Sequence, residues 1–423
     1  MNPRKINRVS TGRRKFGFDG VKIAIIMVGL LVAIVVFLMV VGHLDLSHIR
    51  ERTVANDDNS NNIPEVTTPF NDNFREGTPL QLPESADNAR FYHEEGGLLE
   101  LPIAGATGWV AAASALHAAA NIESDEIAEL QAGTVFTIMS DSGDWWRIQL
   151  ADGTTGWVDW RRCFINLPDV LPSIVYNITN ASASQFRSNG FDMTGVSGQR
   201  LYTARAFNER LNRDEYIVPA MFPLARALHG AQQAAQEIGH TLVIYEAFRP
   251  LSAQTTVVNA MTTLMGNNAA VNNAFENSPW PLIWFMPSGT SNHQRGGTIA
   301  ASLARINNVE VQQSGNYSFL RFPNASAINT VTRVHEISPA SAILDAPWGI
   351  LARQIINESV TMTGPAITDG IASMQKIFAS AGLTPLASMW WHFDHSPSNN
   401  LARSADVTGN FYTPVIRSIA PTN

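Results

Sequence analysis

Three short segments of this 423-residue chain contain the side chains best suited to chemistry. They are YEAFRP at 245–250, SNHQRG at 291–296 and WWHF at 390–393. Together they supply Arg249, Ser291, His293 and His392. A histidine in such a setting either binds a metal or lies hydrogen-bonded in a pocket. The single cysteine, Cys163, excludes a disulfide within the chain and any cysteine-based zinc or iron–sulfur site.

At these segments the sequence resembles the D-alanyl-D-alanine carboxypeptidase and dipeptidase family of zinc metallopeptidases, over roughly residues 165–400. Each motif alone is weak, but all three occur in the family's order. The resemblance implies a catalytic zinc with three protein ligands and a fourth position for the water that it activates. In the family the ligands are a His, an Asp seven residues later and a distant second His. A Glu three residues before the second His is the general base.

Carried over residue by residue, the resemblance implies that His293 and His392 are the two histidine ligands. It implies that Arg249 stabilises the oxyanion of the scissile amide and that Ser291 helps to hold the substrate. The two carboxylate positions depart from the pattern. Ala300 stands where the third zinc ligand belongs, and Met389 stands at the position of the base. We therefore expect weak zinc binding and a rate lower by a further ~10²–10⁴-fold.

A substitute carboxylate could restore the metal site. Asp394 lies two residues after His392, so in a strand the two side chains share one face. His395 and the pair His335-Glu336 are the other candidates. A carboxylate near a histidine is, however, more often a solvated or capping group than a metal ligand.

A smaller domain is expected over residues 100–166, where short strands alternate with turn signals. The run GDWWRIQLADGTTGWVDWRRC resembles a bacterial SH3-like barrel, a module that commonly binds cell-wall peptides. The stretch Leu116–Ala120 occupies the place where the family has polar ligand contacts, so we expect weak wall binding. Trp146 and Trp157 are expected in the core rather than on a ligand platform. The barrel is expected to fold independently as a spacer or docking module.

The N-terminal region predicts a membrane anchor. Seven basic residues and one acidic residue in 1–42 accompany an apolar run of twenty residues, Ile23–Gly42, which spans roughly 30 Å as a helix. A cleaved signal peptide has a shorter apolar region and a small-residue cleavage site. We therefore expect an uncleaved signal anchor over residues 21–43 of a bacterial cell membrane. The basic segment 1–20 would lie in the cytoplasm and the rest of the chain outside, facing the wall.

The fold class expected is an α+β peptidase-like domain over residues 168–412, with an antiparallel sheet and flanking helices, plus the small all-β barrel and one transmembrane helix. Residues 44–95 are rich in Asn, Asp, Pro and Thr and are expected to be a flexible linker. The net charge of −7 combines +6 in residues 1–42 with −13 in the remainder. A chain body this acidic excludes nucleic acid as a partner.

Three functions remain open from the sequence. The first is a catalytically impaired member of the family that still recognises peptidoglycan stem peptides ending in D-Ala. The second is an active zinc peptidase with relocated ligands. The third is a non-enzymatic scaffold that binds another envelope protein.

Overall fold

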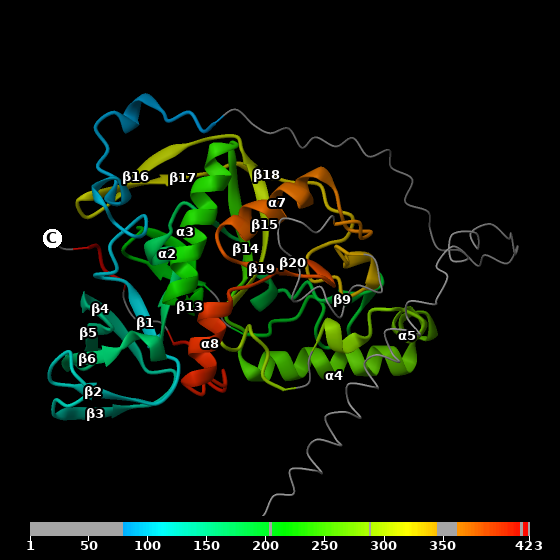
Figure 1. The fold of residues 1–423 in the computed structure, drawn as a ribbon, viewed down its shortest axis with the longest axis horizontal. Coiled ribbons are helices and arrows are strands. Elements are labelled where there is room, and N and C mark those ends of the chain that lie inside the picture. Colours follow the sequence, from blue (N-terminus) through cyan, green and yellow to red (C-terminus); the bar gives the residue numbers. More distant parts are fainter. Residues whose placement is uncertain (1–78, 203–204, 287–288, 345–361, 415–417, 422–423) are drawn as a thin grey trace, which may run out of the picture. The chain divides into compact units, whose positions relative to one another are not determined.

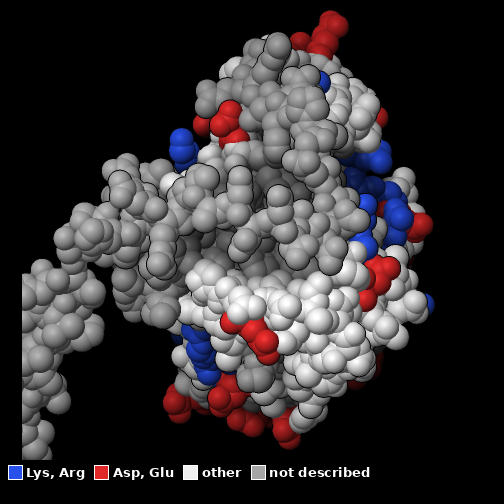
Figure 2. Space-filling model, turned by 90° about the vertical axis from the view of Figure 1, so that its right-hand side faces the viewer, with Lys and Arg blue, Asp and Glu red and all other residues white. Residues whose placement is uncertain are grey.

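The structure is a computed structural model, and it describes residues 79–202, 205–286, 289–344, 362–414 and 418–421. Residues 71–423 form one compact unit that contains all of these. In Figure 2 the described surface below the centre of the view is mostly free of acidic and basic side chains, in keeping with a charged fraction of 15%.

The first sheet contains the barrel. Its strand order is β13-β7-β1-β4-β5-β6-β2-β3, and all of its pairs are antiparallel. The strands are β1 (Thr107–Val110), β2 (Ser114–His117), β3 (Glu126–Leu130), β4 (Val135–Ser142), β5 (Trp145–Leu150), β6 (Thr155–Asp159), β7 (Cys163–Asn166) and β13 (Pro219–Met221). Burial alternates along β5 as the sequence predicts: Trp146 is fully buried and its neighbour Arg147 is exposed. Gly153 adopts a φ of 88° at the turn between β5 and β6.

The buried core of the barrel is continuous with that of the next domain. Strand β13 comes from beyond the barrel and pairs with β7 through Ala220 and Ile165. The Trp146 ring packs edge-on against Phe222, with 5.4 Å between ring centroids, and Leu224 belongs to the same buried cluster. Part of the apolar face of the barrel is thus covered by the next domain, and the independent folding of the barrel stays a prediction.

The second large sheet carries the three motifs. Its order is β19-β20-β15-β14-β8, with β18 also paired to β15, and the β14–β8 pair alone is parallel within this sheet. Its strands are β8 (Val175–Tyr176), β14 (His240–Glu246), β15 (Thr298–Ile306), β18 (Ala325–Ala327), β19 (Thr384–Leu386) and β20 (Met389–Asp394). Three described two-stranded sheets complete the domain: β9 (Arg187–Ser188) with β10 (Phe191–Asp192), β11 (Arg205–Asn208) with β12 (Arg213–Tyr216), and β16 (Glu310–Ser314) with β17 (Tyr317–Arg321).

Helices flank this sheet (Figure 1). They are α2 (Leu167–Val170), α3 (Phe222–Glu237), α4 (Leu251–Asn267), α5 (Ala269–Glu276), α7 (Asp369–Ser380) and α8 (Ser396–Ser404). Both α3 and α7 pack on strands of the sheet and on each other. Gly239 and Gly382 follow them with φ values of 71° and 82°, the left-handed conformation that ends a helix. The mixed helix-and-sheet domain and the barrel expected from the sequence are both present.

The structure corrects the expected transmembrane helix. Among the described residues, no helix is both long and apolar enough to cross a membrane. The longest of them, α4, has 17 residues, about 25 Å in length, and contains several polar side chains. The expected anchor, residues 21–43, lies outside the described residues. This part of the predicted fold class, and with it the single-pass membrane localisation, is not retained.

A buried carboxylate joins the barrel to the larger domain. Asp169 in α2 is fully buried, and its Oδ2 accepts hydrogen bonds from the Thr107 backbone N–H at 2.8 Å and from Ser418 Oγ at 2.7 Å. Its Oδ1 accepts from Asn208 Nδ2 at 2.6 Å. One side chain therefore connects β1 of the barrel, the end of a strand that contains Asn208 (Arg205–Asn208) and the C-terminal segment. Satisfying three buried donors at once makes this carboxylate a structural link.

Asp169→Ala should destabilise both parts of the molecule together. It leaves three buried donors without an acceptor, so we expect the free energy of unfolding to fall by about 2–4 kcal/mol in a single transition. Chemical denaturation followed by tryptophan fluorescence and by circular dichroism measures this. The exposed Asp125→Asn in the barrel should have little effect. Two separate transitions in the wild-type protein would contradict the shared core.

Candidate functional site

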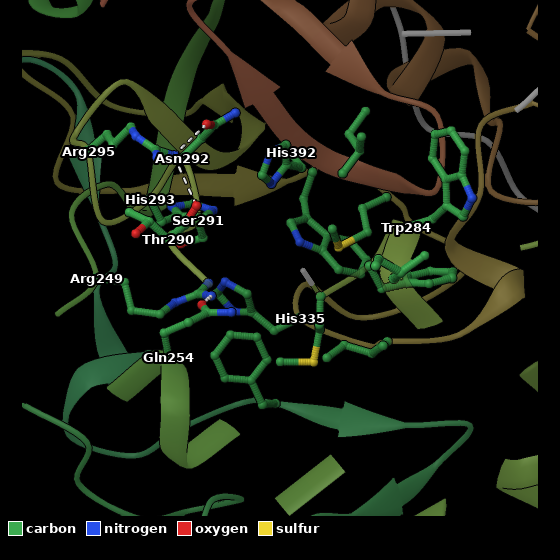
Figure 3. A pocket seen from close by; sticks show the side chains of 18 of the residues that line it. Arg249, Gln254, Trp284, Thr290, Ser291, Asn292, His293, Arg295, His335 and His392 are labelled. Atoms are coloured by element: carbon green, nitrogen blue, oxygen red, sulfur yellow. Dashed lines mark hydrogen bonds between the residues drawn. The ribbon is translucent and has the colours of Figure 1, made fainter. Parts of the chain in front are cut away.

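The three motifs meet at one cavity of about 230 Å³ (Figure 3). Arg249 follows β14, Ser291 and His293 precede β15, and Met389 and His392 lie on β20. Because β14, β15 and β20 are neighbours in the sheet, segments about 150 residues apart in sequence come together. All five side chains line the cavity, as the sequence motifs predict.

His293 is held as a neutral imidazole. Its Nδ1 lies 2.8 Å from the Ala247 carbonyl oxygen, and since a carbonyl only accepts, Nδ1 carries the proton. Burial, and then the nearby charge of Arg249, lower the pKa of His293 to about 3. Its Nε2 therefore keeps a free lone pair. The His392 ring lies 5.1 Å away between centroids and nearly perpendicular to it.

Asp394 is a partner of His392 and does not line the cavity. Its Oδ1 lies 3.3 Å from His392 Nε2 and accepts hydrogen bonds from Thr298 Oγ1 at 2.5 Å and Asn292 Nδ2 at 3.0 Å. Burial opposes ionisation, but His392 and these donors together lower the pKa of Asp394 below its usual range. The two side chains share a strand face, as the sequence predicts. The carboxylate considered as a substitute zinc ligand is instead used to orient His392.

Arg249 is fixed by a buried ion pair with Glu246, which is fully buried. The Arg249 Nε donates to Glu246 Oε1 at 2.9 Å, and Nη2 contacts Oε2. Tyr202 donates to the same carboxylate at 3.0 Å and Asn180 at 3.3 Å, while Arg249 Nη1 donates to Gln254 at 2.6 Å. Burial opposes ionisation of Glu246, but Arg249 holds the pKa of this carboxyl well below its usual value. The guanidinium is thus placed in one orientation.

The missing zinc ligand has a defined place in the sheet. Ala300 pairs with His392 on one side and with Glu246 on the other, so the three residues form one row across β20, β15 and β14. Residues paired in this way share a face of the sheet. An acidic residue at position 300 would lie beside His392, but Ala300 offers a buried methyl group. Met389, at the base position, presents a thioether to the cavity.

The residues present do not fit a three-ligand zinc site. The cavity supplies the imidazoles of His293 and His392, while Glu246 is bound to Arg249 and Asp394 is bound to three donors. Within the described part of the chain, no group of three or more His, Cys, Asp or Glu side chains is placed to hold a metal ion. Zinc usually requires three protein ligands, and an anionic ligand offsets its charge. The structure therefore does not support the zinc that the resemblance implied.

The other candidates from the sequence have separate roles. His335 lines the cavity with a φ of 62°, and its Nε2 lies 3.4 Å from Glu246 Oε2 without satisfactory hydrogen-bond geometry. Glu336 turns away and accepts from the Gly190 backbone at 2.7 Å. His395 makes a contact of 2.8 Å with Ser398 and lies outside this cavity.

Sequence reasoning missed several lining residues. These are Phe186, Gln254, Ile283, Trp284, Phe285, Met286, Thr290, Asn292, Arg295, Ile337, Leu386, Trp391 and Arg403. It also missed the role of Glu246, which stands within the first motif three residues before Arg249 and could have been recognised as its partner. In Figure 3 the polar side chains of Ser291, His293 and Arg295 lie on one side and Trp284 on the other.

Glu246→Ala should lower the free energy of unfolding by about 3–5 kcal/mol, because it leaves the Arg249 charge buried without a partner. Thermal and urea unfolding measure the effect. The double variant Glu246→Leu with Arg249→Met removes both charges and should lose less than the single variant. The pKa of Glu246 is lowered in the folded protein. Its contribution to the free energy of unfolding is therefore complete above the ordinary carboxyl pKa, and it is lost as pH falls from there through the lowered pKa. A difference between wild type and Glu246→Ala that stays constant down to pH 2 would contradict this assignment.

Comparison with protein families identifies both domains. Residues 111–162 match the family described as bacterial SH3 domain. Residues 220–408 match the family described as D-ala-D-ala dipeptidase, and this range includes all three motifs. The comparison with curated proteins gives no match. The chain therefore contains a region that matches the bacterial SH3 domain, followed by a region that matches the D-ala-D-ala dipeptidase family.

Proposed function

We propose that the cavity binds the D-Ala-terminated end of peptidoglycan stem peptides and that zinc-dependent hydrolysis has been lost. One observation carries this proposal. The cavity keeps the arginine, the serine and both histidines of the motifs, while Ala300 and Met389 replace the zinc ligand and the base. The parts that would hold a peptide are present, and the parts that would activate water are absent among the described residues.

The cavity offers suitable groups for a small peptide terminus. A guanidinium has five N–H donors, of which Arg249 uses two on Glu246 and one on Gln254, so two remain for a peptide oxygen. Ser291 and the free Nε2 of His293 add a hydroxyl and an acceptor on the same side. The opposite wall is apolar and includes Trp284. Small methyl groups such as those of D-Ala can pack against such a wall.

Hydrolysis lacks two of its requirements. A thioether cannot accept the proton of an attacking water, so the general base is missing at Met389. The imidazole of His392 is hydrogen-bonded to Asp394, and no carboxylate follows at position 300 to complete a metal site. We infer that the domain acts as a binding module, which binds the peptide and does not cleave it.

The metal-based part of this proposal can be tested directly. Purified full-length protein should contain far less than one zinc per chain and should release no D-Ala from a stem pentapeptide. In the double variant Ala300→Asp with Met389→Glu, the new carboxylate at position 300 is buried beside Glu246. A bound cation is needed to offset its negative charge. Added zinc should therefore raise the melting temperature of this double variant and leave that of the wild type unchanged. The single variants should respond less. Stoichiometric zinc with turnover in the wild-type protein would overturn the proposal in favour of relocated ligands.

The recognition part has its own test. Ser291→Ala should weaken binding of N-acetyl-Lys-D-Ala-D-Ala by about 3–10-fold, the effect of one hydrogen bond, as measured by isothermal titration calorimetry. Ser380→Ala, on α7 and outside the cavity, is the matched control and should bind as the wild type does. If the wild-type protein binds no peptide ending in D-Ala, the recognition function is refuted and the scaffold alternative gains support.

A further inference from the structure

Two arginines that have no acidic partner among the described residues converge at the same cavity. Arg403 in the last turn of α8 donates from Nη2 to Asn292 Oδ1 at 3.0 Å. Arg295 donates from Nη1 to the same oxygen at 3.5 Å and to the Thr290 carbonyl at 2.9 Å. Both side chains line the cavity. Two guanidinium groups, called the arginine pair below, thus share one neutral acceptor.

Their charges are not neutralised within the part of the chain that is described, since no Asp or Glu there lies within ion-pair distance of either guanidinium. Asp394 reaches the pair only through Asn292, whose Nδ2 donates to it at 3.0 Å. The Nε of Arg295 is buried and has no hydrogen-bond partner. Arg249 differs, because Glu246 neutralises it. Burial, and then the neighbouring Arg403, lower the pKa of Arg295.

Such an arrangement is unfavourable unless an anion completes it. Like charges repel, and a buried N–H without an acceptor costs free energy. A carboxylate placed between the guanidiniums would supply two oxygens in the planar geometry that arginine binds best. The polar contacts of the pair are to neutral oxygens of Thr290, Asn292 and Asn400, so no acidic side chain of the described segments already occupies this position.

We infer that the arginine pair, Arg295 and Arg403, is a subsite for a second carboxylate of the bound peptide, distinct from the peptide terminus near Arg249 and Ser291. This inference rests on the proposed function, which supplies the peptide. Arg295 and Asn292 lie on the polar side of the cavity with Ser291 and His293 (Figure 3). The ligand is therefore a stem peptide whose residue before D-Ala-D-Ala carries a free side-chain carboxylate, as diaminopimelate does and lysine does not.

The test compares two pentapeptides that differ in one group. One carries diaminopimelate with its side-chain carboxylate free, and the other carries the same residue with that carboxylate amidated. Titration calorimetry with the full-length protein should give at least about tenfold tighter binding of the free acid. The preference should shrink when salt is raised from 50 to 500 mM. Arg295→Gln with Arg403→Gln should bind both peptides equally, with the affinity of the wild type for the amidated one.

Two further variants make the test robust. Arg403→Gln alone changes an exposed side chain and should lose part of the preference even if the double variant folds poorly. Arg226→Gln, an exposed arginine on α3 outside this cavity, should keep the full preference. Equal binding of both peptides by the wild type, or a preference that survives in the double variant, would overturn the subsite while leaving the proposed function intact. Binding of neither peptide would refute the proposed function and the subsite with it.

Discussion

The buried ion pair between Arg249 and Glu246 is the interaction on which the site depends. It stands at the end of β14, whose last residue is Glu246, and Arg249 lines the cavity. A buried guanidinium without a counter-charge would be costly, and Glu246 also binds Tyr202 and Asn180, so the carboxylate is fully used. This has a chemical consequence. The one carboxylate in the row with Ala300 and His392 is already committed to an arginine and is not free for a metal ion.

The charges around the cavity follow a consistent arrangement. His293 is neutral, Arg249 is neutralised by Glu246, and Asp394 is engaged with His392. The arginine pair at Asn292 is the remaining positive charge among the described lining residues. In a zinc peptidase a cation at the centre would polarise the substrate. This cavity instead has its unneutralised positive charge on arginine side chains, which are able to bind a carboxylate.

The barrel and the peptidase-like domain are joined more closely than a tether would join them. Strand β13 adds to the barrel sheet, Phe222 covers Trp146, and Asp169 binds donors from three segments. These contacts bury apolar surface that each part alone would expose to water. The SH3 domain therefore shares a continuous apolar core with the domain that contains the cavity. Any wall contact made by the barrel would be held in a fixed relation to that cavity.

The sequence alone determined the parts that depend on local pattern and residue identity. Alternation predicted β5, glycines predicted the ends of α3 and α7, and the motifs predicted that Arg249, Ser291, His293, Met389 and His392 would share a site. The loss of both carboxylates could also be read directly. Local patterns carry this information because they reflect the periods of strands and helices and the limits of φ.

The tertiary structure decided which side chains already have hydrogen-bond or ion-pair partners. In the sequence, Asp394 was a possible substitute metal ligand and Arg295 was only a residue of the second motif. In the structure, Asn292 makes hydrogen bonds to Asp394, to Arg295 and to Arg403 of α8. Such partnerships join residues about a hundred positions apart, so only the packing of the whole domain fixes them.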